Sequence, residues 1–492
     1  MSTSAPEATA VAKPPATGAV VAVLAFAGIV VSLMQTLVIP IIPHLPEYLN
    51  APASDTAWAI TATLLAASVA VPTMGRLGDM FGKRRMLLIS IVLLVAGSLV
   101  AALSSSLIPM VVGRALQGLA AGLIPLGISV MRDVLPPQKL AGAVAMMSAS
   151  LGVGGALGLP IAALIAEYAD WHVLFWASAA LGVVAGALIV KIVPESPVRT
   201  GGSFDFVGAI SLSTALVALL LAVSKGSDWG WTSGQTLSLL AIALVAFLAW
   251  GWWELRVTRP LVDLRIAVRR QVLFTNLASI VFGFAMFAAT MVFPQVVQLP
   301  ESTGFGLGGS MLMSGLVMAP FGVVMMLIAP VSSKITNAYG PKITLMLGAV
   351  IVATGYGIGT FSLHSIWQLI MIAIIIGTGT GMAYGAIPAL IMAAVPPTET
   401  GAANSFNTLM RSLGTSFASA IAGVILAQMT ITIGATSVPS ENAFRVIMAL
   451  AAGSAIAALI LTAFLPKFRA PDSGRDAVLG AALKEPVAAR AE

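Results

Sequence analysis

The sequence predicts an all-α membrane protein whose 14 transmembrane helices are arranged as six, two and six. Hydrophobic residues occupy 58% of the 492 positions and charged residues only 9%, too few charges to cover the surface of a water-soluble domain. Apolar runs long enough to cross a bilayer recur along the chain, and lysines and arginines gather on one side of them. A weak internal repeat then divides these spans into two halves.

Each predicted span is an apolar run, because backbone groups left unpaired in hydrocarbon are costly and a helix of about 20 residues crosses the bilayer core. The first run begins near Gly18 and is too long for the apolar core of a cleaved signal peptide, so we predict that it is the first span. The predicted spans are 18–42, 55–74, 86–103, 107–130, 140–165, 172–193, 205–224, 236–253, 271–298, 309–330, 342–361, 366–392, 401–427 and 442–465.

The positions of the cations predict the orientation of these spans. Of the 25 lysines and arginines, 21 fall in segments on the side of the two termini, and only Lys225 falls on the opposite side. Arg114, Arg411 and Arg445 lie within spans or at their edges. Because loops rich in Lys and Arg stay in the cytoplasm, we predict that both termini are cytoplasmic. We also expect the protein to lie in the plasma (inner) membrane. The net charge of +6 therefore reflects orientation and does not indicate nucleic-acid binding.

A weak internal repeat links the segment after the second span to the segment after the tenth. Aligning Gly340 with Gly82 pairs Lys334 with Arg76 and Lys342 with Arg84, and this offset leaves room for two inserted helices. The predicted parts are an N-terminal tail (1–17), a six-helix half (18–193), a linker with two additional spans (194–270), a second six-helix half (271–465) and a C-terminal tail (466–492). Residues 254–270 are expected to lie along the inner membrane surface.

The segment Gly75–Arg85 concentrates charge between two apolar runs. It holds one carboxylate, Asp79, four cations, and glycines spaced through it: Gly75, Arg76, Gly78, Asp79, Gly82, Lys83, Arg84 and Arg85. A loop that only anchors two helices explains the cations but neither the carboxylate nor the glycines. The alternative interpretation is the gating loop of a transporter.

These residues resemble the major facilitator superfamily, and in particular its fourteen-span branch of drug and antibiotic exporters (drug:proton antiporter-2 type). Gly75–Arg85 is similar to the signature between spans two and three, and Arg114-Ala-Leu-Gln-Gly118 is similar to a second signature in span four. Gly154, Gly158 and Pro160 resemble the glycine-rich fifth-span signature of antiporters, although the proline is displaced by one position.

The resemblance implies two six-helix halves that rock around a central cavity. Within that fold, Asp79 is expected to hold the cytoplasmic ends of the halves together in the outward-open state, either by facing the positive end of a helix dipole or by pairing with a cation. Gly340-Pro341 offers such a helix start, because proline is favoured in the first turn. Arg132 is a second expected partner, and the glycines permit close backbone approach and tight turns.

Several polar residues within spans are candidates for substrate binding or coupling. An unpaired cation at membrane depth is expensive, so Arg114 is a functional candidate, although backbone carbonyls or snorkelling can instead satisfy it. Arg411, nearer the cytoplasmic end of its span, is a candidate with the structural alternative equally open. Gln117 lies one turn from Arg114 on the same helix face. Amides at membrane depth need partners and are candidate cavity groups. The candidate set is Gln35, Arg114, Gln117, Asn276, Gln295, Asn404 and Arg411.

The residue that would couple transport to protons is not evident. The resembling branch commonly has an aspartate in the first span, and here that position is Met34. None of the 19 Asp and Glu residues is predicted at a membrane midplane. Asp79 and Asp133 at the inner rim, or Asp55 at the outer rim, remain alternatives, and a proton gradient is implied as a partner by the resemblance alone.

The sequence therefore predicts a transporter and not an enzyme. Cysteine is absent, which excludes disulfides and thiolate metal sites, and we expect neither a metal nor a cofactor. The expected partners are a small hydrophobic substrate and the lipid bilayer, with no nucleic acid, and we expect a monomer. We predict efflux of drugs or antibiotics in exchange for protons. The alternatives are a lipid or metabolite transporter of the same fold with different or no proton coupling, and a non-transporting membrane sensor or scaffold.

Overall fold

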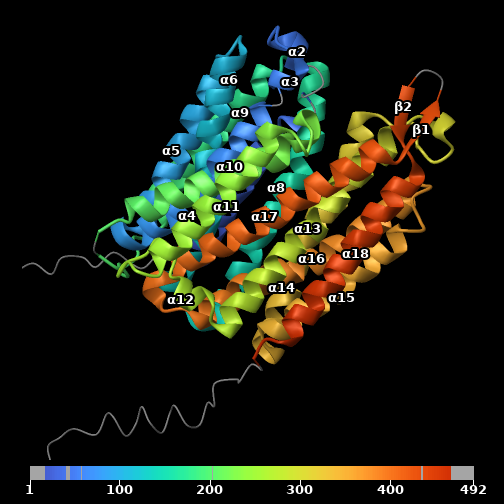
Figure 1. Ribbon diagram of the computed structural model, residues 1–492. Coiled ribbons are helices and arrows are strands. Elements are labelled where there is room, and N and C mark those ends of the chain that lie inside the picture. Colours follow the sequence, from blue (N-terminus) through green and yellow to red (C-terminus); the bar gives the residue numbers. More distant parts are fainter. Residues whose placement is uncertain are drawn as a thin grey trace, which may run out of the picture.

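A computed structural model describes residues 17–39, 41, 45–56, 58–201, 203–433 and 436–466. Within these ranges 14 helices are long and apolar enough to cross a membrane, which confirms the predicted number. Figure 1 shows two bundles of tilted helices, one coloured blue to teal and the other yellow to red. Of the predicted tails, residues 1–16 and 467–492 lie outside the described residues.

The first six spans form one bundle with its own apolar core. The fourth span consists of two helices joined by the 3-10 turn η2 (Ala120–Gly122), and two short helices, α2 (Leu45–Tyr48) and α3 (Ala53–Thr56), precede the second span. The six spans are α1 (Thr17–Thr36), α4 (Trp58–Phe81), α5 (Lys83–Ala102), α6 (Leu107–Leu119) with α7 (Leu123–Val134), α8 (Pro137–Tyr168) and α9 (His172–Ile192).

The last six spans form the second bundle, with a second apolar core. Their connections include the 3-10 turns η3 (Glu301–Thr303) and η4 (Pro397–Glu399), and an antiparallel hairpin of β1 (Thr430–Ile433) and β2 (Thr436–Pro439) that the sequence analysis missed. The six spans are α13 (Arg270–Gln298), α14 (Met311–Tyr339), α15 (Pro341–Gly359), α16 (Ile366–Ala394), α17 (Thr400–Gln428) and α18 (Glu441–Ala463).

The two inserted spans are α10 (Phe206–Trp229) and α11 (Gly234–Glu254), followed by the short helix α12 (Leu264–Ala267). The insert packs across the seam between the halves, because α10 contacts both α4 and α17. Leu261 and Val262 are buried with Leu409 and Leu413 of α17 in a small apolar cluster. The segment after α11, which was expected to lie along the membrane surface, therefore buries part of its apolar surface in the protein.

The halves meet along two seams, α4 against α17 and α8 against α14. Small residues permit the second contact: a Cβ at Gly315 of α14 would lie 2.9 Å from the backbone nitrogen of Pro160 in α8. One end of the bundle carries Asp79, the end of α4 and the start of α17. We call this end the Asp79 face and the other end the opposite face.

The segment predicted as a loop after the second span is mostly helical. The predicted span ended at residue 74, whereas α4 continues to Phe81 and only Gly82 separates it from α5. Gly82 has a φ of 111°, a conformation that side-chain-bearing residues rarely adopt, so the turn there requires glycine. Gly340, which the repeat aligned with Gly82, has a φ of 88° between α14 and α15. The weak sequence repeat thus marks two equivalent turns.

Candidate functional site

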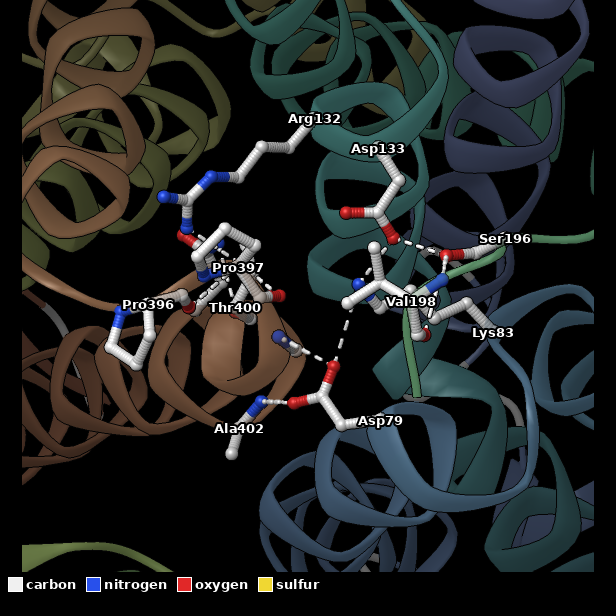
Figure 2. Close-up of polar contacts among 12 residues, drawn as sticks. Asp79, Lys83, Arg132, Asp133, Ser196, Val198, Pro396, Pro397, Thr400 and Ala402 are labelled. Atoms are coloured by element: carbon white, nitrogen blue, oxygen red, sulfur yellow. Dashed lines mark hydrogen bonds and ion pairs between the residues drawn. The ribbon is translucent and has the colours of Figure 1, made fainter. Parts of the chain in front are cut away.

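Asp79 connects the two halves at the Asp79 face. Its Oδ1 accepts a hydrogen bond from the backbone N–H of Gly401 (3.1 Å) and its Oδ2 accepts one from that of Ala402 (2.8 Å) (Figure 2). Both donors lie in the first turn of α17, where N–H groups have no partner within their own helix. The positive end of the helix dipole also favours a carboxylate there. Asp79 is only 1% exposed, so this contact between halves excludes water.

The local sequence explains why α17 starts at this position and why α4 can approach it. Pro396 and Pro397 precede the helix, and the Thr400 hydroxyl donates to the carbonyl of Pro397 (2.9 Å). A Cβ at Gly401 would lie 2.7 Å from Oδ1 of Asp79, and a Cβ at Gly75 would lie 2.6 Å from the Gly401 carbonyl oxygen. Glycine at both positions therefore permits the direct contact between the backbones of α4 and α17.

The negative charge of Asp79 has a buried cation beside it, and the start of the linker adds hydrogen bonds around the pair. Lys83 Nζ lies 3.6 Å from Oδ1 of Asp79 and 2.5 Å from Oδ2 of Asp133, and the Lys83 side chain is completely buried. Ser196 donates a hydrogen bond to the same carboxylate of Asp133, and the backbone N–H of Thr200 donates to the Asp79 carbonyl (2.8 Å). Buried charges need such partners, because an isolated ion inside a protein costs several kcal/mol.

Arg132 makes a second contact between the halves, near Asp79 (Figure 2). Its guanidinium donates to the Thr400 hydroxyl (2.6 Å) and to the Val395 carbonyl (3.0 Å). Arg132 was expected to be a partner of Asp79, but in the structure it contacts the start of α17 directly. Two side chains from the first half thus hold the same helix start of the second half.

The expected helix partner of Asp79 was wrong. Gly340-Pro341 begins α15, whereas the carboxylate of Asp79 contacts the start of α17. The physical reason is the arrangement of the halves, because α4 packs against α17 at the seam. Gly340-Pro341 forms the turn in the second half that is equivalent to Gly82-Lys83 in the first, and it does not contact Asp79.

The other charged residues of this segment have different surroundings. Arg76 is 7% exposed and lines a cavity of about 200 Å³ together with Arg259, Asp263 and Glu399. Arg84 donates to the carbonyl of Val190, and Arg85 is exposed. A Cβ at Gly78 would overlap Leu126 of α7, so this glycine permits close packing within the first half.

Arg114 holds three helices together near the opposite face. Its guanidinium donates to the carbonyls of Met34 (2.9 Å) and Ala59 (3.2 Å) and to the side-chain oxygen of Gln117 (2.7 Å). Gln117 in turn donates to the hydroxyl of Ser98 (2.8 Å). In the part of the chain that the structure describes, no carboxylate lies within 4 Å of this cation. Its present contacts therefore fit the structural alternative, in which backbone carbonyls satisfy the arginine.

Arg411 and three amides lie where α17 meets the rest of the second half. The Arg411 guanidinium lies over the ring of Tyr384, 4.7 Å from its centroid. The side chain of Asn407, which the sequence analysis missed, donates to Asn276 (2.8 Å) and links α17 to α13. Asn404 donates to the carbonyl of Thr400 (3.0 Å), while its side-chain oxygen is buried without a partner.

A second cavity, of about 210 Å³, lies nearer the opposite face. Its lining comes from both halves and from the insert, since it includes Leu64 of α4, Ser224 of α10 and Met291 of α13. Ser416 and Ser419 of α17 add hydroxyl groups to a mainly aliphatic wall. The predicted cavity residues Gln35 and Gln295 do not line it. Gln35 is exposed and Gln295 is partly buried.

Comparison with known proteins assigns the fold to a family. A family model described as Major Facilitator Superfamily matches residues 24–337 and 277–488. The chain belongs to the major facilitator superfamily. This superfamily consists of transporters, and the 14 spans arranged as six, two and six agree with its fourteen-span branch.

Two relatives of this major facilitator protein are named for drug or antibiotic resistance. It is 28% identical over 406 residues to the tetracenomycin C resistance and export protein of Streptomyces glaucescens, covering 81% of this chain and 73% of that protein. It is 25% identical over 378 residues to multidrug resistance protein 3 of Bacillus subtilis, covering 75% and 72%. The recognised resemblance to the drug-exporter branch is thereby confirmed.

Solved structures show the same fold. The human organic anion transporter MFSD10 (TETRAN) superposes with a TM-score of 0.64 at 15% identity, covering 91% of this chain and all of that chain. The proton:xylose symporter XylE, bound to 6-bromo-6-deoxy-D-glucose, superposes with the same score at 16% identity, covering 92% and 97%. At these identities the similarity concerns the fold alone.

The residues that resemble the antiporter signature lie where α8 packs on its neighbours. A Cβ at Gly154 would lie 2.5 Å from the Cβ of Ser32 in α1, and Gly158 faces Thr36 of the same helix. Ser32 donates to the carbonyl of Leu151 (2.7 Å), and Pro160 lies against α14 as described above. In this conformation, these residues set the helix spacing between α1, α8 and α14.

The sequence analysis missed the residues of α17 that receive Asp79. The signal was present, because Pro136-Pro137 stands at the start of α8 and Pro396-Pro397 stands just before α17, at nearly the same offset as the recognised repeat. Proline pairs before apolar runs mark helix starts. Extending the repeat to these pairs would have marked the start of α17 as the second-half counterpart of the start of α8.

Proposed function

We propose that this major facilitator protein is a secondary transporter that works by alternating access and exports hydrophobic drugs or antibiotics in exchange for protons. The observation that most directly supports alternating access is the contact of Asp79 with the first turn of α17. This contact joins the two halves through a few polar bonds at one face. Breaking it would free the halves to rock around a central site.

We further propose that the Asp79 face is cytoplasmic and that the membrane is the plasma membrane. The support is the charge distribution, with 21 of the 25 lysines and arginines on the side of the termini. The second cavity is lined by the parts of α4, α10, α13 and α17 that are remote from Asp79. In this orientation the closed gate is on the inside and the cavity is nearer the outside, as expected of an outward-facing transporter.

Export of hydrophobic compounds is supported by the names of the two relatives and by the cavity wall. Aliphatic residues with a few hydroxyls suit apolar ligands that carry hydrogen-bonding groups. The direct test is expression in a drug-sensitive host, with accumulation measured for a broad panel of dyes and drugs. Asp79→Asn is the matched negative control. We expect lower accumulation with the wild type than with D79N, and equal accumulation across the panel would remove the export proposal.

Exchange for protons rests on the resemblance to antiporters, in particular on Gly154 and Gly158 of the fifth span. Met34 replaces the expected first-span aspartate, so the proton would be carried elsewhere. The test is transport by reconstituted protein in liposomes with an imposed pH gradient. We expect uptake driven by the gradient to stop when an uncoupler collapses it. Transport that ignores the collapsed gradient would contradict proton exchange.

A second candidate is a lipid or metabolite transporter of the same fold, and two departures favour it. The first-span position is Met34, and Pro160 is displaced in the antiporter-like segment. This candidate predicts no effect on the drug panel but binding of a lipid or metabolite to the purified protein. Membership of a transporter superfamily disfavours the third alternative, a sensor or scaffold.

A further inference from the structure

The charged residues deep within the described spans are all positive, and this bears on which substrates the protein can bind. Among the described residues, only Arg114 and Arg411 are charged and lie more than six residues from both ends of their span. Both are cations. A charge at this depth is costly unless it has partners, so each of them needs an explanation.

The two arginines differ in how well they are satisfied. Arg114 is 2% exposed, and its Nε and Nη1 donate to two backbone carbonyls and to Gln117. Arg411 is partly exposed, and its guanidinium donates no hydrogen bond and forms no ion pair within the part of the chain that the structure describes. Its one specific contact is the ring of Tyr384. Arg411 therefore retains N–H donors that a ligand can use.

The depth of this pair matches that of a central binding site. Arg411 is eleven residues after the start of α17 and Tyr384 ten residues before the end of α16. At about 1.5 Å per residue both lie about 15 Å from the Asp79 face, half the thickness of a bilayer core. A Cβ at the neighbouring Gly385 would lie 3.0 Å from the Cβ of Ala145 in α8, so at this level the second half meets the first.

Tyr384 holds the guanidinium in place. The tyrosine is 1% exposed, and its hydroxyl lies 2.6 Å from the sulfur of Met286 in α13. A buried ring beneath the Cζ atom of an arginine restrains the guanidinium while leaving its N–H groups available to other partners. Such an oriented fork matches the two oxygens of a carboxylate or a similar oxyanion.

We infer that Arg411, supported by Tyr384, binds the anionic group of the substrate, so that the transported compounds are amphipathic organic anions and not cations. This inference rests on the proposed function, because it names the substrate class of the central site. With no carboxylate at this depth in the described spans, the site offers a cationic drug no opposite charge and one like charge.

The test uses two dyes built on the same xanthene ring system, the anion fluorescein and the cation rhodamine 123, in inside-out vesicles that contain the protein. We expect the wild type to move fluorescein in preference to rhodamine 123. Arg411→Gln should lower fluorescein transport about tenfold or more, the effect of losing one charge-assisted hydrogen bond, without lowering that of rhodamine 123. Arg411→Lys, which keeps the charge, should retain the preference for the anion.

The matched control is Arg445→Gln, which removes a cation of α18 that is paired with Glu441 near the opposite face. It should leave the preference unchanged. Equal loss of both dyes in R411Q would assign Arg411 a structural role and overturn the inference. Transport of rhodamine 123 without fluorescein would also overturn it, while leaving export intact. Transport of neither dye would count against export itself and remove the inference with it.

Discussion

Replacing Asp79 with asparagine perturbs the contact between the halves with little change in volume. The wild-type carboxylate accepts two backbone hydrogen bonds from α17, one for each oxygen. In Asp79→Asn one of these oxygens becomes an NH₂ group, which cannot accept a hydrogen bond from the backbone N–H that faces it. The charge that faces the helix dipole is lost as well.

The size of the effect follows from these contacts. A hydrogen bond to a charged group contributes about 1.5–3 kcal/mol, and the dipole interaction contributes up to about 2 kcal/mol when partly buried. The loss of one such bond and part of the dipole term gives about 3 kcal/mol. At about 1.4 kcal/mol per factor of ten, the ratio of closed to open protein at the Asp79 face should fall about 100-fold. A closed majority would then become a minority.

The absence of cysteine allows this shift to be measured directly. Spin labels on Val190→Cys of α9 and Tyr339→Cys of α14 sit on exposed residues of the two halves at the Asp79 face. Distances measured by double electron–electron resonance should show a longer population in D79N that is minor in the wild type. The control is Asp170→Asn, an exposed acid at the opposite face. If D79N keeps the wild-type distances, the proposed gate is wrong.

Three further predictions concern other residues. In Gly75→Val the valine Cβ would overlap the backbone of α17, so the variant should stay open at the Asp79 face and should not transport, although the protein remains in the membrane. Normal transport by G75V would show that close contact of α4 with α17 is not needed. Arg114→Gln should destabilise the purified protein by about 2–4 kcal/mol, since two buried carbonyls lose their donor. Arg445→Gln, which breaks a partly exposed ion pair, should cost at most about 1 kcal/mol. Thermal unfolding in detergent compares the two variants, and equal melting temperatures would contradict the predicted difference. Hydrogen bonds from the backbone N–H and from the ring of His172 lower the pKa of Asp170, so this acid stabilises the fold at pH above its ordinary pKa, and the stabilisation is lost as pH falls through the lowered value. His172→Ala removes the ring but keeps the backbone N–H, so it should raise the pKa of Asp170 only part of the way toward its ordinary value in a titration. An unchanged pKa would refute the contribution of the ring.

Composition and charge were sufficient to predict the fold because the bilayer permits few solutions. A span needs a long apolar run, and runs of that length are easy to count in a sequence. The predicted number of 14 spans is confirmed. The ends of spans were less predictable. α4 continues through the charged segment to Phe81, because Asp79 and Lys83 find partners inside the protein, which hydropathy alone does not show.

The candidate site was predictable as a list of residues but not as a set of contacts. Asp79 and Arg132 both lie at the seam, yet their partner is α17, and no local pattern in the sequence of α4 states which helix of the other half it faces. Arg114 and Arg411 were both predicted within spans, with Arg411 nearer the cytoplasmic end, but the sequence did not show which of them has hydrogen-bond partners. Only packing distinguishes them, because the carbonyls of Met34 and Ala59 surround the first and an aromatic ring lies under the second.

The internal repeat leads to a last prediction, on the second seam. The offset that aligns Gly82 with Gly340 also aligns Asp79 with Asn337, and the pairing of α4 with α17 then corresponds to that of α14 with α8. The two positions differ physically, since Asn337 is exposed while Asp79 is 1% exposed. An exposed carboxylate interacts weakly with a helix start, because water screens it.

We therefore expect Asn337→Asp to leave both transport and the distance between the labels unchanged, while Asp79→Asn alters both. The seam of α8 and α14 depends on close packing of small residues, such as Gly315 against Pro160, and among its described side chains there is no polar bond equivalent to that of Asp79. The same vesicles and labelled pair serve for both variants. A large shift toward the closed form in N337D would show that both seams act as gates. The contact of Asp79 with α17 would then be one half of a symmetric pair.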